Sequence, residues 1–214
     1  MTKTGINILF VGNSFTARNN LPQLLVDLAA QRGVEVRFDL IQAGGASLRM
    51  HWNKGDVLKA IKKTRFDWVV LQEQSTLPVK NAIRMRENIE LFAEPIASSG
   101  AKMALYLTWA RRNAPDSQNA ITNAYTAIGK QLGATVVPAG IAWKAFLEKH
   151  DTPALHDNDM SHPTLAGSYL AACVFLATLF EENATGIKTE LKGVSTAERL
   201  ALQKVAWTVG KKAR

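Results

Sequence analysis

The chain has 214 residues, of which 47% are hydrophobic and 21% are charged, a balance typical of a packed globular protein. It excludes a disordered, collagen-like or coiled-coil chain. The formal net charge is +8, but the basic residues are scattered, which argues against a nucleic-acid groove, and the single cysteine, Cys173, excludes an internal disulfide framework and a cysteine-rich zinc site.

Strand and helix patterns alternate along the sequence. Short apolar runs predict strands at residues 6–11, 34–41, 68–71, 103–108 and 135–137. Apolar residues at helical spacing predict helices at 21–32, 56–64 (with Asp56 as a candidate cap), 84–98, 116–132, 141–149 and 164–182, and a capping box at 195–198 opens a last one. This alternation favours right-handed βαβ units with helices on both faces of the sheet. We therefore predict an α/β fold: a three-layer α/β/α sandwich, flavodoxin-like, with about five mainly parallel strands.

The sequence contains no linker, repeat or low-complexity stretch. We therefore predict a single domain over residues 1–214, in which 184–214 form a C-terminal helical extension packed on the rest. The longest apolar run, 169–180, is shorter than the ~20 residues that a bilayer needs, and the first residues lack the apolar core of a signal peptide. These features predict a cytoplasmic protein with no membrane and no nucleic-acid partner. A homodimer through the apolar faces of the two C-terminal helices is an alternative to a monomer.

Ligands of parallel sheets bind beyond the carboxyl ends of the strands, which directs attention to the loops at 12–18, 43–47, 72–75 and 108–112. The first of these loops places Ser14 on a tight turn after a buried strand. A serine there can act as a nucleophile if a general base lies within hydrogen-bond reach. The alternatives are that Ser14 caps the next helix, or that the loop binds a phosphate, although neither a G-x-G-x-x-G nor a Walker motif is present.

A candidate base lies near the other end of the sequence, where residues 156–163 read His-Asp-Asn-Asp-Met-Ser-His-Pro. The spacing of Asp159 and His162 allows one short turn to hold a carboxylate against an imidazole. The carboxylate would fix the tautomer of the ring and stabilise the imidazolium. The alternatives are a solvated capping loop and a metal site formed by His156, Asp157, Asp159 and His162, for which no His-Glu-x-x-His motif is present.

Together these motifs resemble those of the SGNH (GDSL-like) hydrolase superfamily, over about residues 5–183. The first block of that superfamily, usually Gly-Asp-Ser, is Gly-Asn-Ser at residues 12–14. The last block, Asp-x-x-His followed by a helix, matches Asp159 and His162. The second block supplies a glycine whose backbone N–H faces the oxyanion, and within residues 44–47 Gly45 fits it best.

The third block departs from the usual pattern. The superfamily normally has Gly-x-Asn-Asp after the third strand, with the asparagine donating to the oxyanion, whereas residues 71–75 read Leu-Gln-Glu-Gln-Ser. This segment is more similar to the Gln-Gly-Glu-Ser of carbohydrate O-acetylesterase-like members. The resemblance assigns the oxyanion amide to Gln72, with Gln74 in reserve. The alternative is that both glutamines only satisfy backbone groups of the loop.

The resemblance implies a serine esterase that needs no metal or organic cofactor. Ser14 would attack an ester carbonyl, His162 would take its proton and Asp159 would hold the imidazole. The N–H groups of Ser14 and Gly45 and the amide of Gln72 would receive the oxyanion. The third block favours a small acyl group, acetyl, on a carbohydrate or similar small molecule. The alternatives are a lipase- or thioesterase-like hydrolase of longer acyl chains, a non-catalytic ligand-binding module on the same fold, and a flavodoxin-like nucleotide-binding protein.

Overall fold

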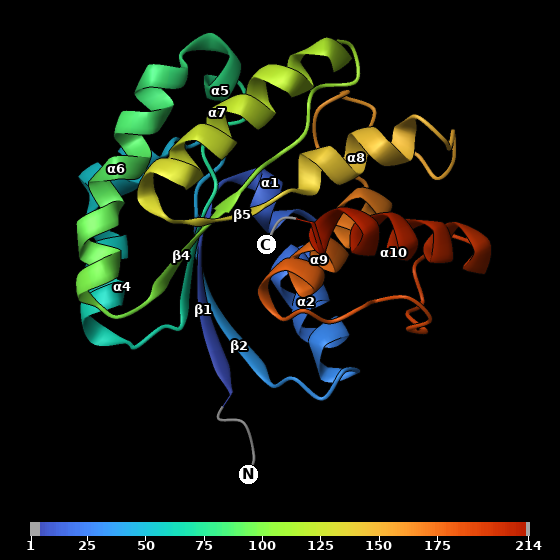
Figure 1. The fold of residues 1–214 in the computed structure, drawn as a ribbon, viewed down its shortest axis with the longest axis horizontal. Coiled ribbons are helices and arrows are strands. Elements are labelled where there is room, and N and C mark those ends of the chain that lie inside the picture. Colours follow the sequence, from blue (N-terminus) through green and yellow to red (C-terminus); the bar gives the residue numbers. More distant parts are fainter. Residues whose placement is uncertain (1–4, 213–214) are drawn as a thin grey trace.

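Figure 1 shows the computed structural model, which describes residues 5–212. The ends of the predicted domain, residues 1–4 and 213–214, lie outside the described residues. Within them, five strands form one sheet in the order β2-β1-β3-β4-β5, and each neighbouring pair is parallel. The strands are β1 (Ile6–Gly12), β2 (Val36–Gln42), β3 (Trp68–Leu71), β4 (Lys102–Tyr106) and β5 (Thr135–Val137). The predicted α/β fold with about five mainly parallel strands is confirmed.

Helices cover both faces of the sheet, because the side chains of each buried strand alternate between two apolar clusters. In β1, Ile8 and Phe10 face one cluster, and Leu9 and Val11 face the other. The first cluster is covered by α2 (Leu21–Ala30), α8 (Ala139–Leu147), α9 (Leu165–Leu179) and α10 (Thr196–Gly210). The second is covered by α3 (Leu48–Lys54), α4 (Asp56–Lys63), α6 (Ala82–Ser98) and α7 (Gln118–Leu132). Two four-residue helices, α1 (Ser14–Ala17) and α5 (Leu77–Lys80), follow β1 and β3.

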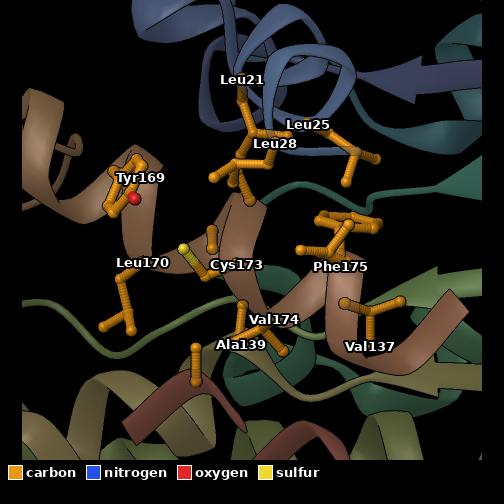
Figure 2. Close-up of a cluster of buried hydrophobic side chains, with 14 of the residues drawn as sticks. Leu21, Leu25, Leu28, Val137, Ala139, Tyr169, Leu170, Cys173, Val174 and Phe175 are labelled. Atoms are coloured by element: carbon orange, nitrogen blue, oxygen red, sulfur yellow. The ribbon is translucent and has the colours of Figure 1, made fainter. Parts of the chain in front are cut away.

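Helix α9 is the central element of the first cluster. Every residue from Ala166 to Thr178 is buried, as expected for a helix that is apolar on all sides. Figure 2 shows Cys173, Val174 and Phe175 of α9 between leucines of α2 and the side chains of Val137 and Ala139. Helix α10 packs across α9, so the apolar surface of α9 is buried within the chain. None of the described helices is long and apolar enough to cross a membrane.

Several element boundaries differ from the sequence-based predictions. Asp56 is the first residue of α4 rather than its cap, because Gly55 in a left-handed conformation ends α3 and begins α4. Strand β2 begins at Val36 rather than 34, since the N–H of Val34 still donates to the Ala29 carbonyl of the preceding helix. The predicted 164–182 helix ends at Leu179. The short helices α1, α3 and α5 are not predicted by the sequence patterns.

Candidate active site

The first loop of the site begins at Gly12, the last residue of β1. A Cβ atom on Gly12 would lie 2.5 Å from Thr16 Oγ1 and 2.6 Å from Gln72 Oε1, so a larger residue does not fit at this position. The chain turns here directly from the buried strand into α1, whose first residue is Ser14. Ser14 is half-buried at the carboxyl edge of the sheet, where the prediction places it.

Asn13 fixes this turn. Its Oδ1 accepts from the N–H of Phe15 (3.0 Å), and its Nδ2 donates to the carbonyl of Ala46 (3.0 Å) in the loop after β2. Asn13 is therefore the N-cap of α1, and the alternative in which Ser14 caps the helix is wrong. An aspartate, the usual residue of the first block, has no N–H to donate to the Ala46 carbonyl.

The structure brings Ser14, His162 and Asp159 together although 148 positions separate the serine from the histidine. Ser14 Oγ lies 2.8 Å from His162 Nε2, and His162 Nδ1 is hydrogen-bonded to Asp159 Oδ2. A carboxylate only accepts, so Nδ1 carries the ring proton and Nε2 accepts from the Ser14 hydroxyl. The imidazole is 27% exposed, which leaves the serine–histidine pair open to a ligand.

The loop around Asp159 is itself ordered by hydrogen bonds. Asp159 Oδ1 accepts from the N–H groups of Ser161 (3.0 Å) and His162 (2.9 Å). The hydrogen bonds from the side chain and backbone of His162 hold the pKa of this carboxyl well below its usual range. Met160, between these residues, has a φ of 60°, a left-handed conformation that costs energy for a residue with a side chain. The hydrogen bonds of this loop, including those of the Met160 backbone to Asp157 and Arg112, therefore keep the turn in one shape.

The metal-site alternative finds no support in this geometry. His156 Nε2 lies 2.9 Å from the carbonyl of Ala110, and Asp157 pairs with Arg18 at 2.7 Å. Among residues 5–212, no group of three or more histidine, cysteine, aspartate or glutamate residues could hold a metal ion.

The expectation that Gln72 donates to the oxyanion is wrong. Its side chain has no exposed surface, so it cannot contact a substrate. Its Oε1 accepts from the N–H of Asn13 (2.9 Å) and from Thr16 Oγ1 (3.0 Å), while Nε2 donates to the carbonyl of Glu73. Gln72 therefore forms hydrogen bonds with polar groups of its own loop and of the loop that carries Ser14. This is the alternative that the sequence left open for Gln72.

Gln74 and Gly45 share a more open position. Both line a hollow of about 580 Å³ beside the loops that follow β2 and β3. Gln74 Oε1 is anchored by the N–H and hydroxyl of Thr76, both at 3.0 Å, and Gln74 Nε2 has no hydrogen-bond partner among the described residues. Gly45 is exposed with a φ of 66°, the left-handed region that favours glycine. Of the two glutamines, Gln74 is the one that a ligand can reach.

Glu73 links these loops, a role that no motif in the sequence indicates. Its buried carboxylate accepts from the N–H groups of Leu48 (2.9 Å) and Gln74 (2.6 Å) through Oε1, and from Asn88 Nδ2 (2.7 Å) through Oε2. Burial raises its pKa, and the three hydrogen bonds oppose that rise. Glu73 thereby ties the loop after β2, the loop after β3 and helix α6 into one unit.

Aromatic packing supports the base from the other side. Phe15 lies 5.5 Å from the ring of His162 and stacks on Trp109 at 4.9 Å, between ring centroids. Trp109 Nε1 donates to the carbonyl of Ser161 (3.0 Å), and its side chain is buried. Trp109 therefore supports the loop that carries His162.

No protein-family model matches the sequence, and no curated protein matches it. Solved structures do match. A protein from Slackia heliotrinireducens, provisionally assigned as an SGNH hydrolase, is 26% identical with a TM-score of 0.72, covering 82% of this chain and 100% of that one. A DUF4886 family protein from Bacteroides uniformis is 20% identical with a TM-score of 0.76, covering 96% and 94%. The acetylxylan esterase Axe2 from Geobacillus stearothermophilus is 17% identical with a TM-score of 0.65, covering 82% and 94%.

These matches extend over most of this chain and nearly all of each solved structure. They share the five-stranded parallel sheet between two layers of helices that positions the loops described above. The resemblance inferred from the sequence motifs is thereby confirmed: the chain has the fold of the SGNH hydrolase superfamily.

Proposed function

We propose that the protein is a serine ester hydrolase with Ser14 as the nucleophile, His162 as the general base and Asp159 as the group that orients the base. One observation carries this proposal: the hydrogen-bonded series from Ser14 Oγ through His162 to Asp159 at the carboxyl edge of the sheet. The structural likeness to an SGNH hydrolase and to esterases supports hydrolysis of an ester in general terms.

The reaction proceeds in two steps. Ser14 Oγ attacks the ester carbonyl while His162 Nε2 takes the hydroxyl proton, and the Asp159 carboxylate stabilises the imidazolium. His162 then gives this proton to the departing alcohol, which leaves an acyl group on Ser14. Water attacks the acyl-enzyme with His162 again as the base, and the acid product leaves as Ser14 regains its proton.

The tetrahedral oxyanion needs donors that a substrate can reach. The capping bonds of α1 engage the N–H groups of Phe15, Thr16 and Ala17, which leaves the N–H of Ser14 for the oxyanion. Gly45 supplies a second N–H from the loop after β2. Gln74 takes the place of the buried Gln72 and supplies the third donor through Nε2.

The substrate that we propose is a small acyl ester, with acetyl as the acyl group and a carbohydrate as one class of alcohol. The support is the likeness to the acetylxylan esterase and the third sequence block. One observation favours the alternative of a longer acyl chain: Met50, 57% exposed, and Leu77 line the hollow next to Gly45.

The test is hydrolysis of p-nitrophenyl esters from acetyl to decanoyl by the wild-type protein and by Ser14→Ala. Ser98→Ala is the matched control, because Ser98 lies on the surface of α6 and its hydroxyl donates to Glu94. We expect hydrolysis that is greatest for acetyl, is lost in Ser14→Ala and persists in Ser98→Ala. A maximum at long chains would replace the acetyl proposal, and hydrolysis that survives Ser14→Ala would overturn the nucleophile.

A further inference from the structure

The hollow beside Gly45 and Gln74 contains an arginine held in a fixed position. Arg49 lies in the first turn of α3, four residues after Gly45, and is half-buried. The other residues that line the hollow are Ser47, Met50, Leu77, Arg84, Glu87 and Asn88. Two of the proposed oxyanion donors, Gly45 and Gln74, line the hollow, so one ligand can fill the hollow and present its ester to these donors.

Two buried polar residues orient the guanidinium. Arg49 Nε donates to Asn88 Oδ1 (3.1 Å), and Asn88 Nδ2 donates to Glu73 Oε2 (2.7 Å). The side chains of Asn88 and Glu73 are 1% and 0% exposed, so the series begins in the core and ends at the hollow. An ordinary surface arginine is solvated by water, and no buried side chains hold its guanidinium in one orientation.

The two terminal nitrogens of this guanidinium have donors available for a ligand. Arg49 Nη1 and Nη2 have no hydrogen bond and no ion pair with any of residues 5–212. Glu73, the carboxylate at the inner end of the series, already accepts from three donors and has no exposed surface. The charge of Arg49 acts on it without a direct ion pair. The lining otherwise carries one basic residue, Arg84, and one acidic residue, Glu87, so its net charge is positive.

We propose that Arg49 binds a carboxylate carried by the substrate, and that the natural substrates are esters with an anionic group. The planar guanidinium presents paired N–H donors that match a carboxylate, and prior orientation through Nε reduces the entropy lost on binding. Arg84 adds to the attraction. This inference rests on the proposed ester hydrolysis for the reaction, but the recognition of the anion has a test of its own.

The kinetic test uses two pairs of esters that differ in charge. Mono-p-nitrophenyl succinate and p-nitrophenyl butyrate place the charge on the acyl side, and 4-acetoxybenzoate and its methyl ester place it on the alcohol side. Arg49→Ala is expected to lower the ratio of kcat/KM for the anionic over the neutral member at least about tenfold in one pair. The pair that responds identifies the side of the ester that occupies the hollow.

The matched control is Arg86→Ala on α6, which removes an exposed arginine that pairs with Glu90 outside the hollow. It is expected to leave both ratios unchanged. Equal losses for anionic and neutral esters in Arg49→Ala, in both pairs, would overturn the inference.

A binding measurement separates the inference from the reaction. In Ser14→Ala, calorimetric titration with the four esters is expected to show tighter binding of one anionic member than of its neutral partner. Adding Arg49→Ala is expected to weaken that binding at least about tenfold. If wild type hydrolyses no ester but this preference is found, the proposed function fails and the anion site stands. If each anionic ester binds no more tightly than its neutral partner, the anion site fails whatever the hydrolysis shows.

Discussion

Two glutamines two positions apart in one loop have opposite surroundings. Gln72 is fully buried and hydrogen-bonded to the loop that carries Ser14. Gln74 lines the hollow, and its amide nitrogen has no hydrogen-bond partner within residues 5–212. The sequence could not separate them, because the chain leaves the strand at Leu71 and the alternation of a strand no longer decides which side chain points inward.

The proposed donor role of Gln74 predicts that Gln74→Ala lowers kcat by about 10²–10³, the typical cost of one oxyanion-hole donor, with a smaller effect on KM. Thr76→Ala is the control, since it removes the hydroxyl that bonds Gln74 Oε1 and keeps the amide nitrogen. Steady-state kinetics on p-nitrophenyl acetate compares the two variants. Equal, small losses in both would show that Gln74 only shapes the loop.

The depressed pKa of Asp159 predicts how this residue affects stability as the pH changes. A carboxyl whose pKa is lower in the folded protein stabilises the fold above its ordinary value of 3.8, and this contribution is lost as the pH falls through the folded value. Urea unfolding of wild type and Asp159→Asn at pH 6 and pH 3 is therefore expected to show a larger difference in stability at pH 6. A difference that does not depend on pH would contradict the role of these hydrogen bonds in stabilising the Asp159 carboxylate.

The same substitution is expected to lower kcat by about 10²–10⁴, because an amide at this position no longer fixes the tautomer of His162. The contact of Asp159 with His162 could be predicted from the sequence, since their short spacing closes a local turn. Glu73, Asn88 and Arg49 could not be predicted as a group, because they lie on three elements and meet only in the folded chain.

At the scale of elements, the strands and the long helices could be predicted, and the shortest helices could not. Helices α6, α7 and α9 contain four or more turns of regular spacing, whereas α1, α3 and α5 have 4 to 7 residues and too few periods to detect. Local caps define the short helices instead: Asn13 caps α1, and Ser47 caps α3. These short helices place the loops of the site.

Glu73 connects the loops after β2 and β3, and Glu73→Gln tests this connection. A glutamine replaces one carboxylate oxygen by an NH₂ group, which cannot accept from the donors that surround this position. Asn88 cannot turn its Oδ1 toward that NH₂ group without losing its hydrogen bond from Arg49. We expect faster hydrogen–deuterium exchange at the N–H groups of Leu48 and Gln74, together with a lower kcat.

The control for this prediction is Glu94→Gln on the surface of α6, where the carboxylate accepts from the Ser98 hydroxyl. It is expected to leave exchange and kcat as in wild type. Unchanged exchange at Leu48 and Gln74 in Glu73→Gln would show that the loops hold their positions without this carboxylate.

At the scale of the whole molecule, the prediction of a single domain depends on how α10 packs. Leu202 of α10 is fully buried in the first cluster, and Gly210 lies so close to α9 that a Cβ atom would be 2.6 Å from Ala177 Cβ. Leu202→Ala is expected to cost about 2–5 kcal/mol of the free energy of unfolding. Unfolding is expected to remain one transition by circular dichroism and by tryptophan fluorescence.

Lys204→Ala, an exposed change on the same helix, is the control and is expected to alter stability by less than about 0.5 kcal/mol. Two separate transitions in Leu202→Ala would show that residues 184–214 form a unit of their own and would contradict the single-domain prediction.

Covalent labelling tests the central claim most directly, since it asks whether His162 activates Ser14. The protein is treated with a p-nitrophenyl alkylphosphonate, and the adduct is measured by intact mass and located by peptide mapping. We predict one adduct, on Ser14, which is absent in Ser14→Ala and forms about 10²–10⁴ times more slowly in His162→Ala. An unlabelled wild-type protein, or an adduct that persists in Ser14→Ala, would contradict the account.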